Sequence, residues 1–245
     1  MNNPIRFIDP DGRSIDWYES KSGSVLWKKG NAPVVTSNGE EFNNIGSTYT
    51  HISGNVSTTY NQNNAISTSI TTNTLSNSDW ESQAYFKDGK IKWDGCKRTS
   101  DKMLSKAGVS STRSNEILMT NHDANGVVTT ATNNVNTGIE VVDNALDSGE
   151  PIIIGVDWKS KQTHNKGKYG DKMTDHFIVI MGKTETFNGS GQKTSTEYRF
   201  FEPGTQNRTK GTSLNNTLKR VDDFLQGKNY RSRKYKTTVI RRNAN

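Results

Sequence analysis

The sequence predicts an α+β fold in which one helix, opened by the only cysteine of the chain, packs on an antiparallel sheet. Three observations support this class. Apolar residues at helical spacing follow Cys96 and stop at Gly108. Compact apolar runs suited to strands come later, from residue 151 onward. The helix precedes the strands, and this order differs from the regular alternation of parallel βαβ proteins.

The elements expected in the second half follow from hydrophobic periodicity. Helices are predicted over 98–107, over 139–146 with a stop at Gly149, and over 214–225 with a stop at Gly227. Strands are predicted over 151–156, 176–180, 198–201 and 237–240. The continuous apolar run 151–156 is typical of a strand that is covered on both faces.

The composition is polar, and the polarity is uneven along the 245 residues. Only 30% of the residues are apolar, and the first third holds few of them. We therefore expect one sizeable core, built mainly from about residue 139 onward. No run of about 18 apolar residues is present, so no membrane-spanning helix is expected. The start of the chain lacks the apolar segment of a signal peptide, so we expect export without a cleavable signal.

The chain is basic, with a formal net charge of +7, and its cations gather near the C-terminus over 228–242. This charge suits nucleic acid, an acidic protein partner or an anionic wall polymer, and a solvated basic face is the simplest interpretation. No recognised nucleic-acid-binding module accompanies the charge, so nucleic acid is not the favoured partner.

Three regions are expected along the chain. Residues 1–30 contain the string Asn-Pro-Ile-Arg-Phe-Ile-Asp-Pro-Asp-Gly over 3–12, which predicts a short strand running into a turn. This string resembles the closing segment of the core of bacterial Rhs/YD-repeat proteins, which precedes their variable toxin domains. An ordinary hairpin turn is the alternative. Residues 31–80 are rich in Asn, Ser and Thr, and this composition predicts a linker or a loosely packed β-region. Residues 81–245 are expected to form the catalytic unit.

The lone cysteine indicates either a reactive thiol or a small buried hydrophobe, because it has no partner for a disulfide. Gly95 before it and a helix after it would place its sulfur at a helix N-terminus, where thiolate is stabilised. His176 stands at the start of one apolar strand and Glu202 at the end of another. Cysteine, histidine and carboxylate form a candidate nucleophile, base and orienting group. With no second cysteine and no His-x-x-x-His spacing, neither a metal nor another cofactor is expected, and we interpret His51, His122 and His164 as surface or loop residues.

Residues 81–240 resemble the papain-like cysteine peptidases, in particular their bacteriocin-leader-peptidase-like branch. The resemblance depends on short segments in a shared order: Gly95-Cys96 with Thr99-Ser100 and Met103-Leu104, then 145–153, 175–180 and 201–204. It implies that Cys96 is the nucleophile and His176 the general base. Glu202 falls where the family usually has an aspartate before proline, and Asp175 and Asn207 are alternative orienting groups. Gln83 takes the place of the glutamine that completes the oxyanion hole.

The resemblances together imply a cysteine peptidase that is the toxin domain of an Rhs-type protein used in competition between bacteria. Its substrate would be a protein of the target cell, and a cognate immunity protein would be a partner. A peptidoglycan amidase or endopeptidase with the same site is an alternative, because cell-wall hydrolases use the same Cys–His chemistry. A non-catalytic binding domain is a second alternative, and a nuclease is the least favoured class.

Overall fold

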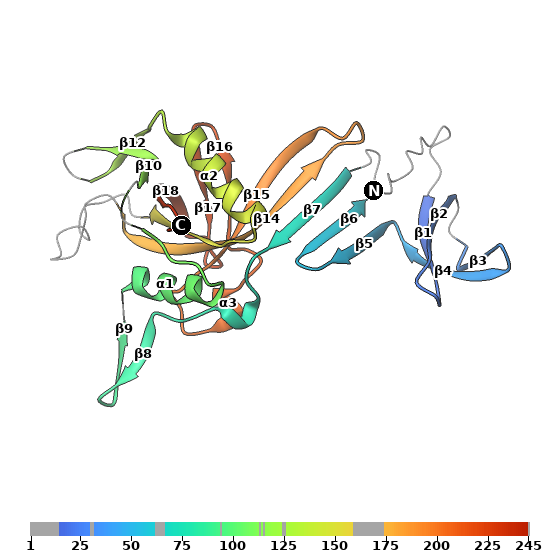
Figure 1. Ribbon diagram of the computed structural model, residues 1–245, viewed down its shortest axis with the longest axis horizontal. Helices are drawn as coiled ribbons and strands as arrows, with labels where there is room; N and C mark the ends of the chain where they lie inside the picture. The colour runs from blue at the N-terminus through green and yellow to red at the C-terminus, as the bar shows by residue number, and fades with distance from the viewer. Residues whose placement is uncertain are drawn as a thin grey trace. The chain divides into compact units, whose positions relative to one another are not determined.

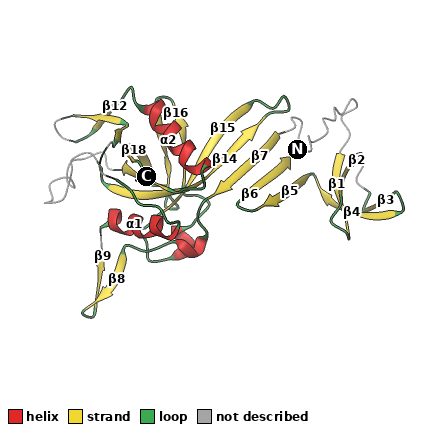
Figure 2. Cartoon of the chain, viewed as in Figure 1, coloured by secondary structure: helices red, strands yellow, loops and turns green. Residues whose placement is uncertain are grey.

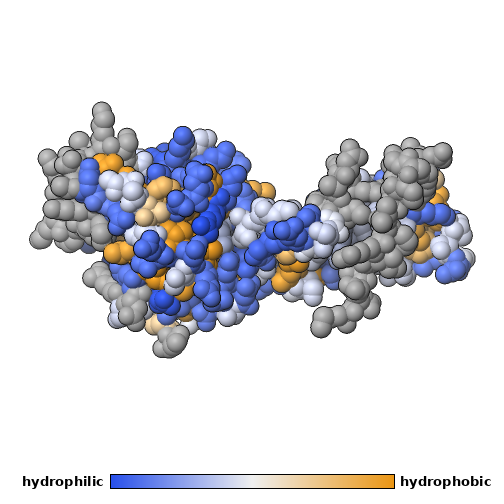
Figure 3. All heavy atoms as spheres, turned by 90° about the horizontal axis from the view of Figure 1, so that it is seen from above, coloured by the Kyte–Doolittle hydropathy of each residue, from blue (hydrophilic) through white to orange (hydrophobic). Residues whose placement is uncertain are grey.

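The structure is a computed structural model that describes residues 15–29, 32–61, 67–93, 95–112, 114, 116–123, 126–158 and 174–244. These residues contain 18 strands, three α-helices and one short 3-10 helix (Figures 1 and 2). They divide into two compact units, residues 1–70 with 185–195 and residues 71–184 with 196–245. The surface face seen in Figure 3 is largely hydrophilic, with smaller apolar patches. The Rhs-like string 3–12 lies outside the described residues, and no described helix is long and apolar enough to cross a membrane.

The first unit consists of short antiparallel strands. They are β1 (Ile15–Ser20), β2 (Val25–Lys29), β3 (Val34–Ser37), β4 (Glu40–Gly46), β5 (Thr48–Ser53) and β6 (Val56–Asn61), followed by β7 (Ser67–Asn73), which ends in the second unit. The first four form a sheet in the order β2-β1-β4-β3, and β5 pairs with β6. Tyr18 and Phe42 are buried, and the rings of Trp17 and Trp27 stack. His51 on β5 is exposed, as the sequence predicted.

The second unit holds all three α-helices. Its elements are η1 (Asn77–Asp79), β8 (Ala84–Lys87), β9 (Lys90–Trp93), α1 (Cys96–Lys106), β10 (Ile117–Leu118), β11 (Thr120–His122), β12 (Val128–Ala131), α2 (Val135–Asp147), β13 (Ile152–Asp157), β14 (His176–Phe187), β15 (Lys193–Phe201), α3 (Arg208–Gly211), β16 (Thr217–Val221), β17 (Phe224–Lys228) and β18 (Lys234–Arg241). The predicted cysteine helix, the helix before Gly149 and the four predicted strands are therefore confirmed. Strand β13 is shifted by one residue from its predicted bounds, and the other five elements are longer than predicted.

Strands β13 to β18 close on themselves into a six-stranded barrel. Each strand pairs with the next in sequence, and β13 pairs antiparallel with both β14 and β18. Successive residues of β13 point to opposite faces: Ile152 and Ile154 join the apolar cluster that also contains α2, whereas Ile153 joins the cluster that contains α1. The strand is thus covered on both faces, as its continuous apolar run predicted.

The predicted α+β, papain-like fold is wrong, because the described chain is mostly strand and contains a closed six-stranded barrel. The error lies in residues 214–225, where the structure has the β16–β17 hairpin instead of a helix. Asp222 turns the chain in the left-handed region, with φ of 53°. A Cβ on Gly227 would lie 2.0 Å from the Thr217 carbonyl oxygen, so this glycine permits the close strand pair. The two strands connect β15 to β18 and complete the barrel.

Candidate active site

Cys96 is the first residue of α1, and its position is set by packing of the rest of the helix. Met103 and Leu104 are fully buried against Ile153 of β13 and Val179 of β14. Gly95 caps the helix with extended backbone (φ −61°, ψ 127°). The sulfur therefore lies at the positive end of a helix that is anchored to the barrel, while Cys96 itself remains partly exposed. The sequence predicted this placement.

The start of β14 meets the start of α1. The backbone N–H of Phe177, the residue after His176, donates to Cys96 Sγ at 3.3 Å. Ser100 Oγ donates to the Phe177 carbonyl at 3.4 Å and adds a second link between helix and strand. The structure thus brings the predicted nucleophile and base together, although 80 positions separate them in the sequence.

Glu202 lies just beyond the end of β15 and faces His176. Its Oε1 is 2.7 Å from His176 Nε2, and both residues are buried. Because Nε2 is engaged by the carboxylate, Nδ1 is the ring nitrogen left for the Cys96 sulfur. The longer glutamate side chain therefore reaches the imidazole, and Cys96, His176 and Glu202 follow one another in a series from sulfur to carboxylate.

The Glu202 carboxylate is held by three further donors. Tyr235 Oη donates to Oε2 at 2.6 Å, Asn229 Nδ2 donates to Oε2 at 3.2 Å, and the Gly204 N–H donates to Oε1 at 2.8 Å. The indole N–H of Trp80 donates to the Glu202 carbonyl at 2.9 Å. Sequence reasoning missed Tyr235, Asn229 and Trp80, because no spacing or motif marks them and they converge only in the folded chain. Gly204, in contrast, belongs to the segment 201–204 that the sequence analysis identified.

Burial and charge act against each other at the site. Burial alone would raise the pKa of the Cys96 thiol, but the hydrogen bond and charge of His176, with backbone N–H groups of Phe177 and Lys97, bring it below its ordinary value. Burial would lower the pKa of His176, but the Glu202 carboxylate and the sulfur raise it to about 10. Burial would raise the pKa of Glu202, but His176 and the other donors lower it to about 2. These directions favour a thiolate–imidazolium pair beside an ionised carboxylate.

The remaining sequence candidates lie around this series. Gln83 donates its backbone N–H to the Pro203 carbonyl at 3.0 Å, next to Glu202, and its side-chain Oε1 is buried without a hydrogen bond. Asp175 instead accepts from the Trp158 N–H, and Asn207 caps α3 by accepting from the Lys210 N–H. Neither of these two is therefore used as the orienting group. His122 ends β11, and His164 lies outside the described residues.

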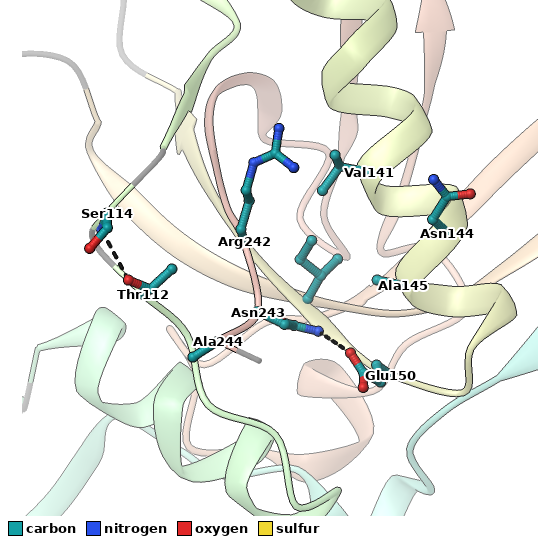
Figure 4. A pocket seen from close by; sticks show the side chains of 10 residues that line it. Thr112, Ser114, Val141, Asn144, Ala145, Glu150, Arg242, Asn243 and Ala244 are labelled. Atoms are coloured by element: carbon teal, nitrogen blue, oxygen red, sulfur yellow. Dashed lines mark hydrogen bonds between the residues drawn. The ribbon is translucent and has the colours of Figure 1, made fainter.

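A separate cleft of about 500 Å³ lies between α2 and the segments around Thr112 and Arg242 (Figure 4). Its lining includes Glu150, whose Oε2 accepts a hydrogen bond from Asn243 Nδ2 at 2.9 Å. Cys96, His176 and Glu202 do not line it. The candidate chemistry therefore rests on the Cys–His–Glu series and not on this cleft. Among the described residues, no group of three or more His, Cys, Asp or Glu side chains is arranged to hold a metal ion.

Comparison of the sequence with protein-family models found no match, and a comparison with curated proteins found no significantly similar sequence.

Proposed function

We propose that this chain is a cysteine peptidase that hydrolyses peptide bonds in a protein of a target cell. The observation that carries the proposal is the position of Cys96 beside the buried His176–Glu202 pair, with the sulfur at a helix N-terminus and bonded to the N–H of Phe177. A structural thiol needs neither a buried ion pair behind it nor partial exposure. Nucleophilic catalysis uses both, because the thiolate must be formed and must also be reached by substrate.

The reaction follows from the roles of the three groups. The Cys96 thiolate attacks the scissile carbonyl carbon and forms a C–S bond, and the carbonyl oxygen becomes negatively charged. As the C–N bond breaks, the His176 imidazolium gives its proton to the leaving amine. His176, now neutral, takes a proton from water, which attacks the thioester and releases the acid and the Cys96 thiolate. Glu202 keeps the ring oriented and stabilises its charged form throughout.

The developing oxyanion requires hydrogen-bond donors. The first turn of α1 supplies backbone N–H groups, which have no partners within a helix. Gln83 is the proposed second donor through its side-chain amide, since its backbone is fastened to Pro203 beside Glu202. Stabilisation by such donors is typically the largest single contribution in acyl transfer.

The biological setting of the proposal rests on the sequence. The Rhs-like string 3–12 supports a role as the toxin domain of an Rhs-type protein that is delivered into a competing bacterium. A cognate immunity protein would protect the producing cell. With a net charge of +7, the toxin would be complemented by an acidic immunity protein.

Expression in a bacterial host, in parallel with Cys96→Ala and His176→Ala, tests the proposal. We expect growth arrest from cytoplasmic expression of the native chain and relief by either substitution. Toxicity that persists in both variants would contradict the catalytic assignment. Lysis restricted to periplasmic targeting, and lost in Cys96→Ala, would instead assign the same site to cell-wall amide hydrolysis.

A further inference from the structure

A basic cleft of about 370 Å³ lies between helix α1 and the segment that leads into the β8–β9 hairpin, two elements that neighbour each other in Figure 1. Its lining residues are Ser82, Tyr85, Lys87, Arg98, Thr99 and Lys102. Three of these six residues are cations, and none is a carboxylate. Its volume is within the range of sites that accept small ligands or single side chains.

Both walls of the cleft are built on elements that also form the catalytic series. Thr99 lies three residues after Cys96 on the same helix, which is about 4.5 Å along the helix axis. On the other wall, Ser82 Oγ donates to the Thr205 carbonyl at 2.6 Å, and Gln83 donates to the Pro203 carbonyl at 3.0 Å. These bonds fasten that wall to the loop that follows Glu202. A polypeptide lying across Cys96 would therefore pass beside the cleft.

Two lysines of the cleft, Lys87 and Lys102, differ from the lysines next to the cleft. Lys97 pairs with Asp101, and Lys106 pairs with Glu81 at 2.6 Å. Among the described residues, neither Lys87 nor Lys102 has such a carboxylate partner. The positive charges of Lys87 and Lys102 are therefore available to a ligand, whereas those of Lys97 and Lys106 are compensated within the chain.

We infer that this cleft is a substrate subsite for an aspartate or glutamate side chain of the protein that Cys96 cleaves. The inference rests on the proposed peptidase function. An entering carboxylate would gain charge-assisted hydrogen bonds from Lys87 and Lys102. The ring of Tyr85, which is 46% exposed, would contact the apolar part of the bound peptide. Substrate selection for acidic residues near the scissile bond follows from this charge.

The test is digestion of a peptide library, prepared from a bacterial proteome, with the purified chain, followed by mass-spectrometric identification of the cleaved bonds. We expect Asp and Glu to be enriched about tenfold at one position near the cleaved bond, because tenfold corresponds to a modest charge-assisted contact. Lys87→Glu and Lys102→Glu should each reduce that enrichment toward the library background. Lys90→Glu is the matched control, since Lys90 pairs with Lys87 across the hairpin but does not line the cleft.

The outcomes distinguish failure of the proposed subsite from failure of the proposed peptidase function. If the native chain cleaves no peptide and behaves like Cys96→Ala, the peptidase function fails. If it cleaves peptides without enrichment of acidic residues, the function stands and the subsite is overturned. Enrichment that survives Lys87→Glu and Lys102→Glu unchanged would overturn the assignment to this cleft. Loss of enrichment in Lys90→Glu to the same degree would show a general effect of net charge and would also overturn it.

Discussion

The Nε2 atom of His176 lies 2.7 Å from Oε1 of Glu202, although 26 positions separate the two residues in the sequence. This contact is a consequence of the hairpin formed by β14 and β15. His176 begins the first of these neighbouring strands and Glu202 follows the end of the second, so the returning chain brings the two together. The base and its orienting acid are thus positioned by rigid strands rather than by a flexible loop.

The ionisation of Cys96 gives the first prediction. Because His176 and backbone N–H groups lower the pKa of the thiol, Cys96 should react with iodoacetamide at lower pH than an ordinary thiol does. In His176→Gln burial is no longer opposed by the imidazolium, so the reactive form should appear only at higher pH. The rate of alkylation of Cys96, measured as a function of pH in the native chain and in His176→Gln, tests both expectations. Identical profiles for the two proteins would contradict the thiolate–imidazolium pair.

The His176–Glu202 pair predicts how stability depends on pH. The pKa of Glu202 falls from 4.5 to about 2 on folding, so its contribution is complete above 4.5 and is lost as the pH falls toward 2. The pKa of His176 rises from 6.5 to about 10, so its contribution is complete below 6.5 and is lost as the pH rises through 10. Both contributions are therefore complete only between 4.5 and 6.5.

Urea unfolding tests this window. We expect the free energy of unfolding of the native chain to decrease from about pH 5.5 to about pH 9.5. Glu202→Gln removes the carboxylate that raises the pKa of His176, so its unfolding free energy should depend less on pH over this range. A native chain and a Glu202→Gln variant with parallel pH profiles would show that the pair does not carry the effect.

Tyr235 should support the site through one hydroxyl group. Tyr235→Phe keeps the ring and removes the donor to Glu202 Oε2, so it should cost about 1.5–3 kcal/mol of unfolding free energy. It should also lower kcat/KM by about tenfold, since the carboxylate becomes less well held. The matched control is Tyr198→Phe, which removes a 2.9 Å hydrogen bond to Asp143, a residue outside the Cys–His–Glu series. Equal loss of activity in both variants would count against a specific role for Tyr235.

Gly204 is the site where a single methyl group should displace the acid. A Cβ at this position would lie 2.7 Å from Glu202 Oε1 and 3.5 Å from His176 Nε2. We expect Gly204→Ala to lower kcat/KM by more than about tenfold and to destabilise the chain by about 1–3 kcal/mol, as overpacking does. The alkylation profile of Cys96 should move to higher pH in this variant. Native activity and an unshifted profile would show that the Glu202 contact is not needed.

The sequence predicted local features well where one pattern had one structural solution. The helix after Cys96 shows helical spacing and a glycine stop, and the continuous apolar run 151–156 forms most of the buried strand β13. The pattern of residues 214–225, in contrast, had two structural solutions. Leu218 and Leu225 fit a helical face, but both are also buried as members of the β16–β17 hairpin. Hydrophobic periodicity over such a short segment does not distinguish a helix from a hairpin. The left-handed turn at Asp222 is what makes this segment a hairpin.

By itself, the sequence determined which groups are chemically able to act: one thiol, a histidine at the start of an apolar strand and a glutamate at the end of another. Only the tertiary structure decided that the fold is a closed barrel and that Tyr235, Asn229 and Trp80 converge on Glu202. The physical reason is that local pattern depends on neighbours along the chain, whereas ring closure and buried hydrogen bonding depend on residues brought together from distant positions.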